Sequence, residues 1–263
     1  MSLRIQFALT ALLAAAALHA QPPPFETDRP DQTETPAIVP AGWFQFEAGC
    51  ARERTDRDGE AISAVTMPTT LAKVGLASWA ELRIITEYQR IASDRTDALP
   101  LNGLVPVEIG AKVKLAAERG LRPRMSLLWH VGLPALAHEA FRPASVFGNF
   151  RFSMQHTLSE RFNLGYNLGA EWDGERPVAT GVYTVSIGMV INDRTGVFGE
   201  AYGFISDTDN PDHRLDAGLT YLLADNVQLD ASGGVSLLPG QWFISAGVSF
   251  RVPVFAARAA TTP

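Results

Sequence analysis

The feature that most constrains this chain is a strict two-residue alternation of apolar and polar side chains, which begins near residue 41. The alternation is clearest in residues 105–115, 162–173, 215–223, 227–235 and 242–250. A period of two is typical of β-strands that have one apolar and one polar face. The strands are about 9–13 residues long, whereas strands of globular proteins are usually shorter, and this length suffices to cross a bilayer at a tilt. The pattern therefore predicts an all-β chain whose strands span a membrane.

Short polar turns recur between these strands, and they predict how the strands connect. Turns of a few residues lie near positions 78, 118, 160, 193 and 225, whereas residues 93–104 and 135–145 form longer segments. Short turns on one rim and longer loops on the other are typical of outer-membrane barrels. We predict an antiparallel transmembrane β-barrel of about 12 strands, with ten or fourteen strands and a two-sheet sandwich as alternatives. The strands are expected at 43–53, 61–75, 80–91, 105–116, 123–134, 146–158, 162–173, 179–191, 196–206, 213–223, 227–237 and 241–251.

The ends of the chain differ from this pattern. Arg4 precedes a nearly continuous apolar run over residues 5–18, which predicts a secretory signal peptide over residues 1–20. A short membrane anchor is the alternative. Residues 21–40 contain six prolines, which disfavour both helix and sheet, and we interpret them as a periplasmic leader. The barrel is then expected over residues 41–251, followed by a C-terminal tail over residues 252–263.

Composition excludes several classes of function. The net charge of −6 and the pI near 5.4 argue against a nucleic-acid partner, which would need a basic face. Cys50 is the single cysteine, so neither an intrachain disulfide nor a multi-cysteine zinc site can form. His138 and Glu139 have no second ligand pair nearby in the sequence. We therefore expect no metal and no cofactor.

The outward face of the predicted barrel suits lipid. It carries no Asp, Glu, Lys or Arg along the central part of the strands, and a charge at mid-membrane costs about 2–4 kcal/mol. Aromatic residues cluster toward both rims, where bilayer interfaces favour them. We expect the outer membrane of a Gram-negative bacterium as the location. Its lipids, the barrel-assembly machinery and an unidentified small solute are the expected partners.

The predicted inward face carries charges of both signs along the strands, with acids in excess of bases. Opposite charges at this density should pair, because an unpaired charge in a confined lumen is costly. They either fill the barrel or line a narrow pore. The predicted lumen-lining residues are Glu47, Glu81, Arg83, Glu87, Glu108, Lys112, Lys114, Arg124, His130, Arg151, Glu171, Glu200, Tyr202, Arg214, Asp216 and Asp230.

Four segments of the sequence resemble a known family. They are Thr27 to Glu34 before the first strand, Leu158 to Arg161, Gly165 to Gly169, and the Trp242 to Arg251 ending. All four are similar to bacterial outer-membrane proteins grouped as the Putative MetA-pathway of phenol degradation. The resemblance covers most of the chain after the signal peptide. It implies an outer-membrane β-barrel that acts as a transporter, and it supplies no residue-level mechanism.

Function is predicted from the barrel and its lumen. We expect a non-enzymatic, porin-like passive channel for small molecules, with aromatic or hydrophobic compounds as candidate solutes. A filled structural barrel without transport is one alternative. An outer-membrane lipid hydrolase is the other, suggested by His156 on the membrane face, but the companion serine is missing because Ser153 lies on the opposite face.

The charged residues of the leader predict an additional role for this segment. Alternating charges in Asp28, Arg29 and Asp31, followed by Glu34, could pair with lumen groups such as Lys112 or Arg151. We predict that residues 25–36 fold back into the periplasmic mouth as a plug. The alternative is a tail that awaits a periplasmic partner.

Overall fold

A computed structural model describes residues 24–57, 59–95, 99–207 and 210–254. The predicted signal peptide and most of the predicted C-terminal tail lie outside the described residues. Residues 24–40 precede the first strand, and residue 254 directly follows the last one.

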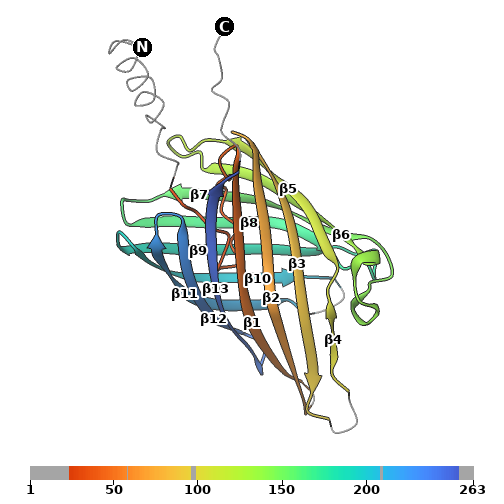
Figure 1. Cartoon of the computed structure of the whole chain (residues 1–263). Coiled ribbons are helices and arrows are strands. Elements are labelled where there is room, and N and C mark those ends of the chain that lie inside the picture. The colour runs from red at the N-terminus through yellow and green to blue at the C-terminus, as the bar shows by residue number, and fades with distance from the viewer. Residues whose placement is uncertain (1–23, 58, 96–98, 208–209, 255–263) are drawn as a thin grey trace, which may run out of the picture.

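The described chain forms one antiparallel sheet that closes on itself (Figure 1). Sequential strands pair with one another, and the first strand pairs with the last over Trp43↔Pro253 to Thr55↔Gln241, which completes the barrel. The strands are β1 (Trp43–Arg57), β2 (Glu60–Ala77), β3 (Ala80–Ser93), β4 (Leu101–Leu104), β5 (Val107–Ala116), β6 (Arg124–Leu133), β7 (Phe147–Thr157), β8 (Phe162–Trp172), β9 (Thr180–Asn192), β10 (Thr195–Ile205), β11 (Asp212–Ala224), β12 (Val227–Ser236) and β13 (Gln241–Pro253).

The barrel has twelve strand positions, as predicted. β4 and β5 both pair with β3, β4 along Tyr88–Ile91 and β5 along Ala80–Ile85, so together they occupy one position. The predicted 61–75 strand is the least regular, because the register of β2 shifts between Thr66 and Thr69, around Pro68. Proline removes a ladder donor, and a bulge at this point accommodates the loss.

The two rims differ in the length of their connections. Short turns such as 78–79, 193–194 and 225–226 lie at the same end as residues 24 and 254, and the long 134–146 connection lies at the other end (Figure 1). That connection contains two 3-10 turns, η1 (Pro134–Leu136) and η2 (Glu139–Phe141). Among the described residues, no helix is long and apolar enough to cross a membrane.

The barrel is apolar outside and polar inside, which inverts the core of a water-soluble protein. Outward side chains such as Leu168 and Ile244 are more than half exposed, at 56% and 55%. Inward side chains such as Glu47, Arg83 and Lys112 are 0% exposed. Buried charges must be paired and hydrogen-bonded, so the inner face needs polar partners. The leader supplies many of them.

Candidate functional site: a leader inside the barrel

The leader, residues 24–40, lies inside the barrel and contacts inward side chains from strands around most of its circumference (Figure 1). Backbone groups of the leader form hydrogen bonds with side chains of the barrel wall rather than with the backbone of a strand. The Ser126 hydroxyl donates to the carbonyl of Pro36 at 2.6 Å, and the backbone N–H of Val39 donates to Glu81 at 2.7 Å. Asn167 and Ser153 both donate to the carbonyl of Glu34. Side chains of the wall thus replace the sheet partners that the prolines of the leader cannot use.

Asp28 is the most deeply held residue of the leader. Its carboxylate lies 2.7 Å from Lys73 Nζ, 2.8 Å from Arg83 Nη1 and 2.8 Å from Lys112 Nζ, and only 7% of the residue is exposed. Burial alone would raise the pKa of this carboxyl, but the attraction of Lys112, Lys73 and Arg83 outweighs burial and holds the pKa well below its usual range. Asp28 is therefore held as an anion among three cations.

A second leader carboxylate, Glu34, extends this arrangement. Arg83 Nη2 donates to both Glu34 oxygens at 2.9 Å, and its Nη1 lies 3.0 Å from Glu81. Glu47 accepts from the backbone N–H groups of Asp28 and Arg29 at 3.1 and 3.0 Å. We call the whole group the clamp; its members are Asp28, Glu34, Glu47, Lys73, Glu81, Arg83 and Lys112. Four acids face three bases there, so each charge has an opposite partner or a backbone donor.

Arg29 points to a different part of the wall, where the first and last strands meet. Its guanidinium donates to Asp230 at 2.9 Å and to Ser245 at 3.0 Å, and Nη1 donates to Thr69 at 3.3 Å. Glycines make this approach possible. A Cβ at Gly49 or Gly247 would lie 2.5–2.7 Å from the Arg29 guanidinium or the facing backbone.

The opposite wall, formed by β9, β10 and β11, holds the leader with acids and hydroxyls. Glu200 accepts from the backbone N–H of Gln32 at 2.7 Å and from the hydroxyl of Thr33, which also bonds Thr184 at 2.7 Å. Asp31 accepts from Ser186 at 3.3 Å. Burial, followed by repulsion from Glu200, raises the pKa of Asp31 well above its usual range. None of the described Lys or Arg residues forms an ion pair with Asp31 or Glu200.

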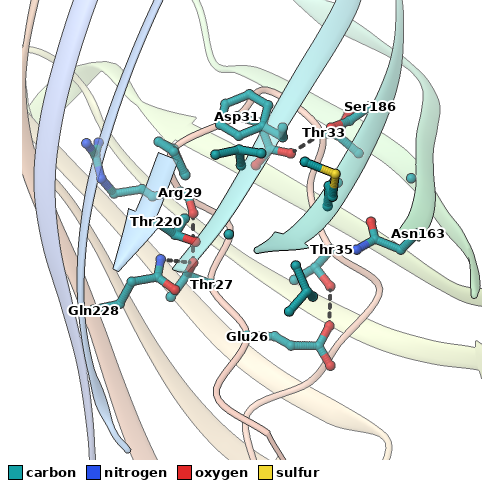
Figure 2. Close-up of a pocket in the computed structure, with 18 of the residues that line it drawn as sticks. Glu26, Thr27, Arg29, Asp31, Thr33, Thr35, Asn163, Ser186, Thr220 and Gln228 are labelled. Carbon is teal, nitrogen blue, oxygen red and sulfur yellow. Dashed lines mark hydrogen bonds between the residues drawn. The ribbon is translucent and has the colours of Figure 1, made fainter. Parts of the chain in front are cut away.

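A cavity of about 350 Å³ separates part of the leader from this wall (Figure 2). Glu26, Thr27, Asp31, Thr33 and Thr35 line its leader side. Asn163, Ser186, Thr220 and Gln228 line the wall side together with apolar Phe198, Met189 and Val197. A cavity of this size matches the lower range of small-molecule sites. The leader thus packs against the clamp side of the lumen and leaves free space on the cavity side.

The remaining predicted lumen residues lie toward the rims. On the long-loop side, Asn149 connects Glu108 at 3.2 Å with His130 at 3.1 Å, and Arg151 lies 3.9 Å from Glu171. Glu87 is half-buried and Tyr202 is buried. Arg214 pairs with Asp212 and Glu53.

Two predicted residues lie at the mouth on the short-turn side. Arg124 pairs with Glu26 of the leader at 2.5 Å, and Lys114 shares the register of the inward face but is exposed. Of the leader residues, Asp28 pairs with Lys112, whereas Arg151 reaches only the carbonyl of Gln32, at 3.2 Å.

Sequence analysis missed several of the residues that hold the leader. Lys73 was omitted because Pro68 obscures the alternation of β2, so the inward face of this strand could not be assigned. Ser126, Ser153, Asn167 and Thr184 are small polar residues, and only the alternation pattern marked them as inward. His156, the residue behind the hydrolase alternative, has Tyr166 as its partner, with the hydroxyl 3.3 Å from Nε2.

Known structures share this architecture. The COG4313 outer membrane channel from Pseudomonas putida F1 superposes with a TM-score of 0.65 at 11% identity, covering 86% of this chain and 100% of that one. The NanC porin gives 0.52 at 7% identity, covering 79% and 100%. The β domain of the Bordetella autotransporter BrkA gives 0.51 at 10% identity, covering 81% and 100%. These likenesses establish the fold, and that fold serves both channels and autotransporters.

Sequence comparison supplies the family. No functionally curated protein matches the chain. The model of the family described as Putative MetA-pathway of phenol degradation matches residues 27–252, which include the leader from Thr27 onward and all the strands except the last residue of β13. The resemblance predicted from the sequence is thereby confirmed, and the chain belongs to this family.

Proposed function

We propose that this protein is an outer-membrane channel for small molecules whose leader acts as a fixed plug on one side of the lumen. The observation that carries the proposal is the cavity between the leader and the β9–β11 wall, since the lumen keeps free space beside the leader there. A closed barrel with an apolar exterior suits a bilayer, and its polar interior suits solutes. The similar solved structures described as a channel and a porin support the same function, and none of the three compared structures is described as an enzyme.

The cavity also bears on the class of solute. Phe25 and Phe198 provide apolar surface, whereas Thr33, Ser186 and Thr220 provide hydroxyls within the same space. Such a lining suits small molecules that combine a ring or short apolar body with polar groups. Large chains do not fit while the leader is in place, because the clamp fills the other side.

Conductance in planar bilayers tests this function. The mature protein should give small single-channel steps, and a variant lacking residues 24–36 should give steps several times larger, because the plug is gone. Arg54→Ala is the control, since Arg54 pairs with Asp56 near the rim, with side chains 39% and 48% exposed, and makes no contact with the leader. A folded parent and a folded deletion variant that both fail to conduct would instead support a filled structural barrel.

A further inference from the structure

One part of the lumen brings three carboxyl groups together without a matching cation. Glu200 on β10 and Asp216 on β11 are directly opposite each other in the antiparallel pair, so both carboxyls point inward side by side. Asp31 of the leader lies within electrostatic range of both. Among the ion pairs of the described residues, none includes Asp31, Glu200 or Asp216. Of the bases near this region, Arg214 is engaged by Asp212 and Glu53 and Arg29 by Asp230, whereas Arg194 lines the cavity at the short turn between β9 and β10.

The burial of Asp216 supports a missing partner independently of the clustering of the acids. Only 7% of the residue is exposed, and neither carboxylate oxygen has a hydrogen-bond donor among the described residues. Buried carboxylates normally accept hydrogen bonds, because an unmet acceptor in a low dielectric is costly. A proton shared with Glu200 would satisfy at most part of this requirement. The Asp216 carboxyl therefore lacks a hydrogen-bond donor in the described part of the chain.

The neighbouring cavity indicates what kind of donor fits. Asp31 lines the cavity, and so do the hydroxyl-bearing residues Thr33 and Ser186 and the aromatic ring of Phe198. Phe198 precedes Glu200 by two residues on the same inward face of β10. The described residues contain no group of three or more His, Cys, Asp or Glu that could hold a metal ion. An ammonium group, with three donors on a flexible stem, does not need the fixed ligand geometry of a metal.

We propose that Asp31, Glu200 and Asp216, together with the adjoining cavity, form a binding site for a small organic amine. The ammonium group donates to Asp31, which lines the cavity, and neutralises the neighbouring acids, and the apolar part of the amine lies against Phe198. This inference rests on the proposed channel function and names a class of solute for it: small cationic amines of the size of one aromatic ring.

Calorimetric titration of the detergent-solubilised mature protein tests the site, with benzylamine as the probe and benzyl alcohol as its uncharged counterpart. Benzylamine should bind at least about tenfold more tightly than benzyl alcohol, because only the amine carries the charge. Asp31→Asn and Asp216→Asn should each weaken benzylamine binding by a similar factor. Glu171→Gln is the matched control, since Glu171 is an inward acid near Arg151 on the long-loop side and should leave binding unchanged.

Equal affinity for the amine and the alcohol would overturn the proposal, and so would unchanged benzylamine binding in Asp31→Asn. Thermal melting and heat-modifiable migration report whether each variant is folded. If Asp216→Asn melts at a higher temperature and the parent binds no benzylamine, the cluster only shares protons and the proposal fails. Conductance distinguishes failure of this inference from failure of the proposed function. A conducting parent that binds no amine refutes this inference alone, whereas a folded parent and a folded leader-deletion variant that both fail to conduct refute the channel.

Discussion

The two walls of the lumen hold the same leader by opposite means. On the β1–β6 side, the clamp fixes Asp28 and Glu34 with three cations at distances of 2.7–3.3 Å. On the β9–β11 side, the leader meets acids and hydroxyls, and a cavity of about 350 Å³ remains. Dense ion pairing holds the leader on the clamp side, whereas free space lies beside the wall with unmatched acids. In the function proposed above, the clamp anchors the leader on one side and the cavity leaves room for solutes on the other.

Removing the clamp should have the largest effect. Arg83→Ala would leave Asp28, Glu34 and Glu81 without their shared partner in a fully buried site. Breaking a buried ion pair from one side costs about 3–5 kcal/mol. We expect the free energy of unfolding in detergent to fall by this amount and the conductance to rise as the leader loosens. Arg54→Ala, at an exposed pair, should change the free energy by less than about 1 kcal/mol. Equal losses for the two variants would contradict the clamp.

Two substitutions in the leader compare the walls directly. Asp28→Asn leaves three buried cations facing a neutral group, so it should release the leader and increase conductance severalfold. Asp31→Asn removes a carboxyl that has no cationic partner, so it should preserve both stability and the plug. Single-channel recording with thermal melting of both variants measures this. If Asp31→Asn opens the channel as much as Asp28→Asn, the two walls hold the leader equally.

The response to pH should also differ between the walls. Because the pKa of Asp28 is lowered, its contribution to stability is present above the usual aspartate range and is lost only as pH falls through the lowered value. Because the pKa of Asp31 is raised, its protonated form favours docking, and docking weakens as pH rises through the raised value. Conductance should therefore increase as pH rises from weakly acidic to alkaline. In Asp31→Asn this part of the pH dependence should be absent, and an unchanged profile would exclude Asp31 as its source.

Single hydroxyls should give the smallest effects. Thr184→Val removes one bond to Thr33 on the cavity side, and Ser126→Ala removes one bond to the Pro36 carbonyl. One buried hydrogen bond contributes about 0.5–1.5 kcal/mol. Chemical unfolding should detect losses of this size. A loss in Ser126→Ala as large as that in Arg83→Ala would mean that backbone anchoring, rather than ion pairing, dominates the clamp side.

The sequence predicted the barrel well because its strands must obey a period of two. Leu168 and Asn167 illustrate this: adjacent in the chain, they are 56% and 1% exposed, as lipid and lumen require. The course of the leader was harder to predict. Prolines indicate where a chain cannot join a sheet, but they do not indicate which side chains of the barrel contact the leader. The charge of Asp28 indicated that this residue pairs with a group in the lumen. Its partner Lys73 was not predicted, because the bulge in β2 interrupts the alternation that would assign Lys73 to the inward face. Unmatched acids at Asp216 and Glu200 emerge only when cross-strand register is known.

The position of Arg29 has a consequence for how the cylinder is built. Its guanidinium joins Thr69 of β2 with Asp230 of β12 and Ser245 of β13, over Gly49 and Gly247, which face each other where the first and last strands meet. Arg29 of the leader therefore links strands on both sides of the β1–β13 junction. This junction cannot form until the final strand has been synthesised and inserted. We expect closure of that junction and burial of the leader to be coupled during biogenesis. The segment that we propose as a plug would then also be an internal template on which the barrel closes.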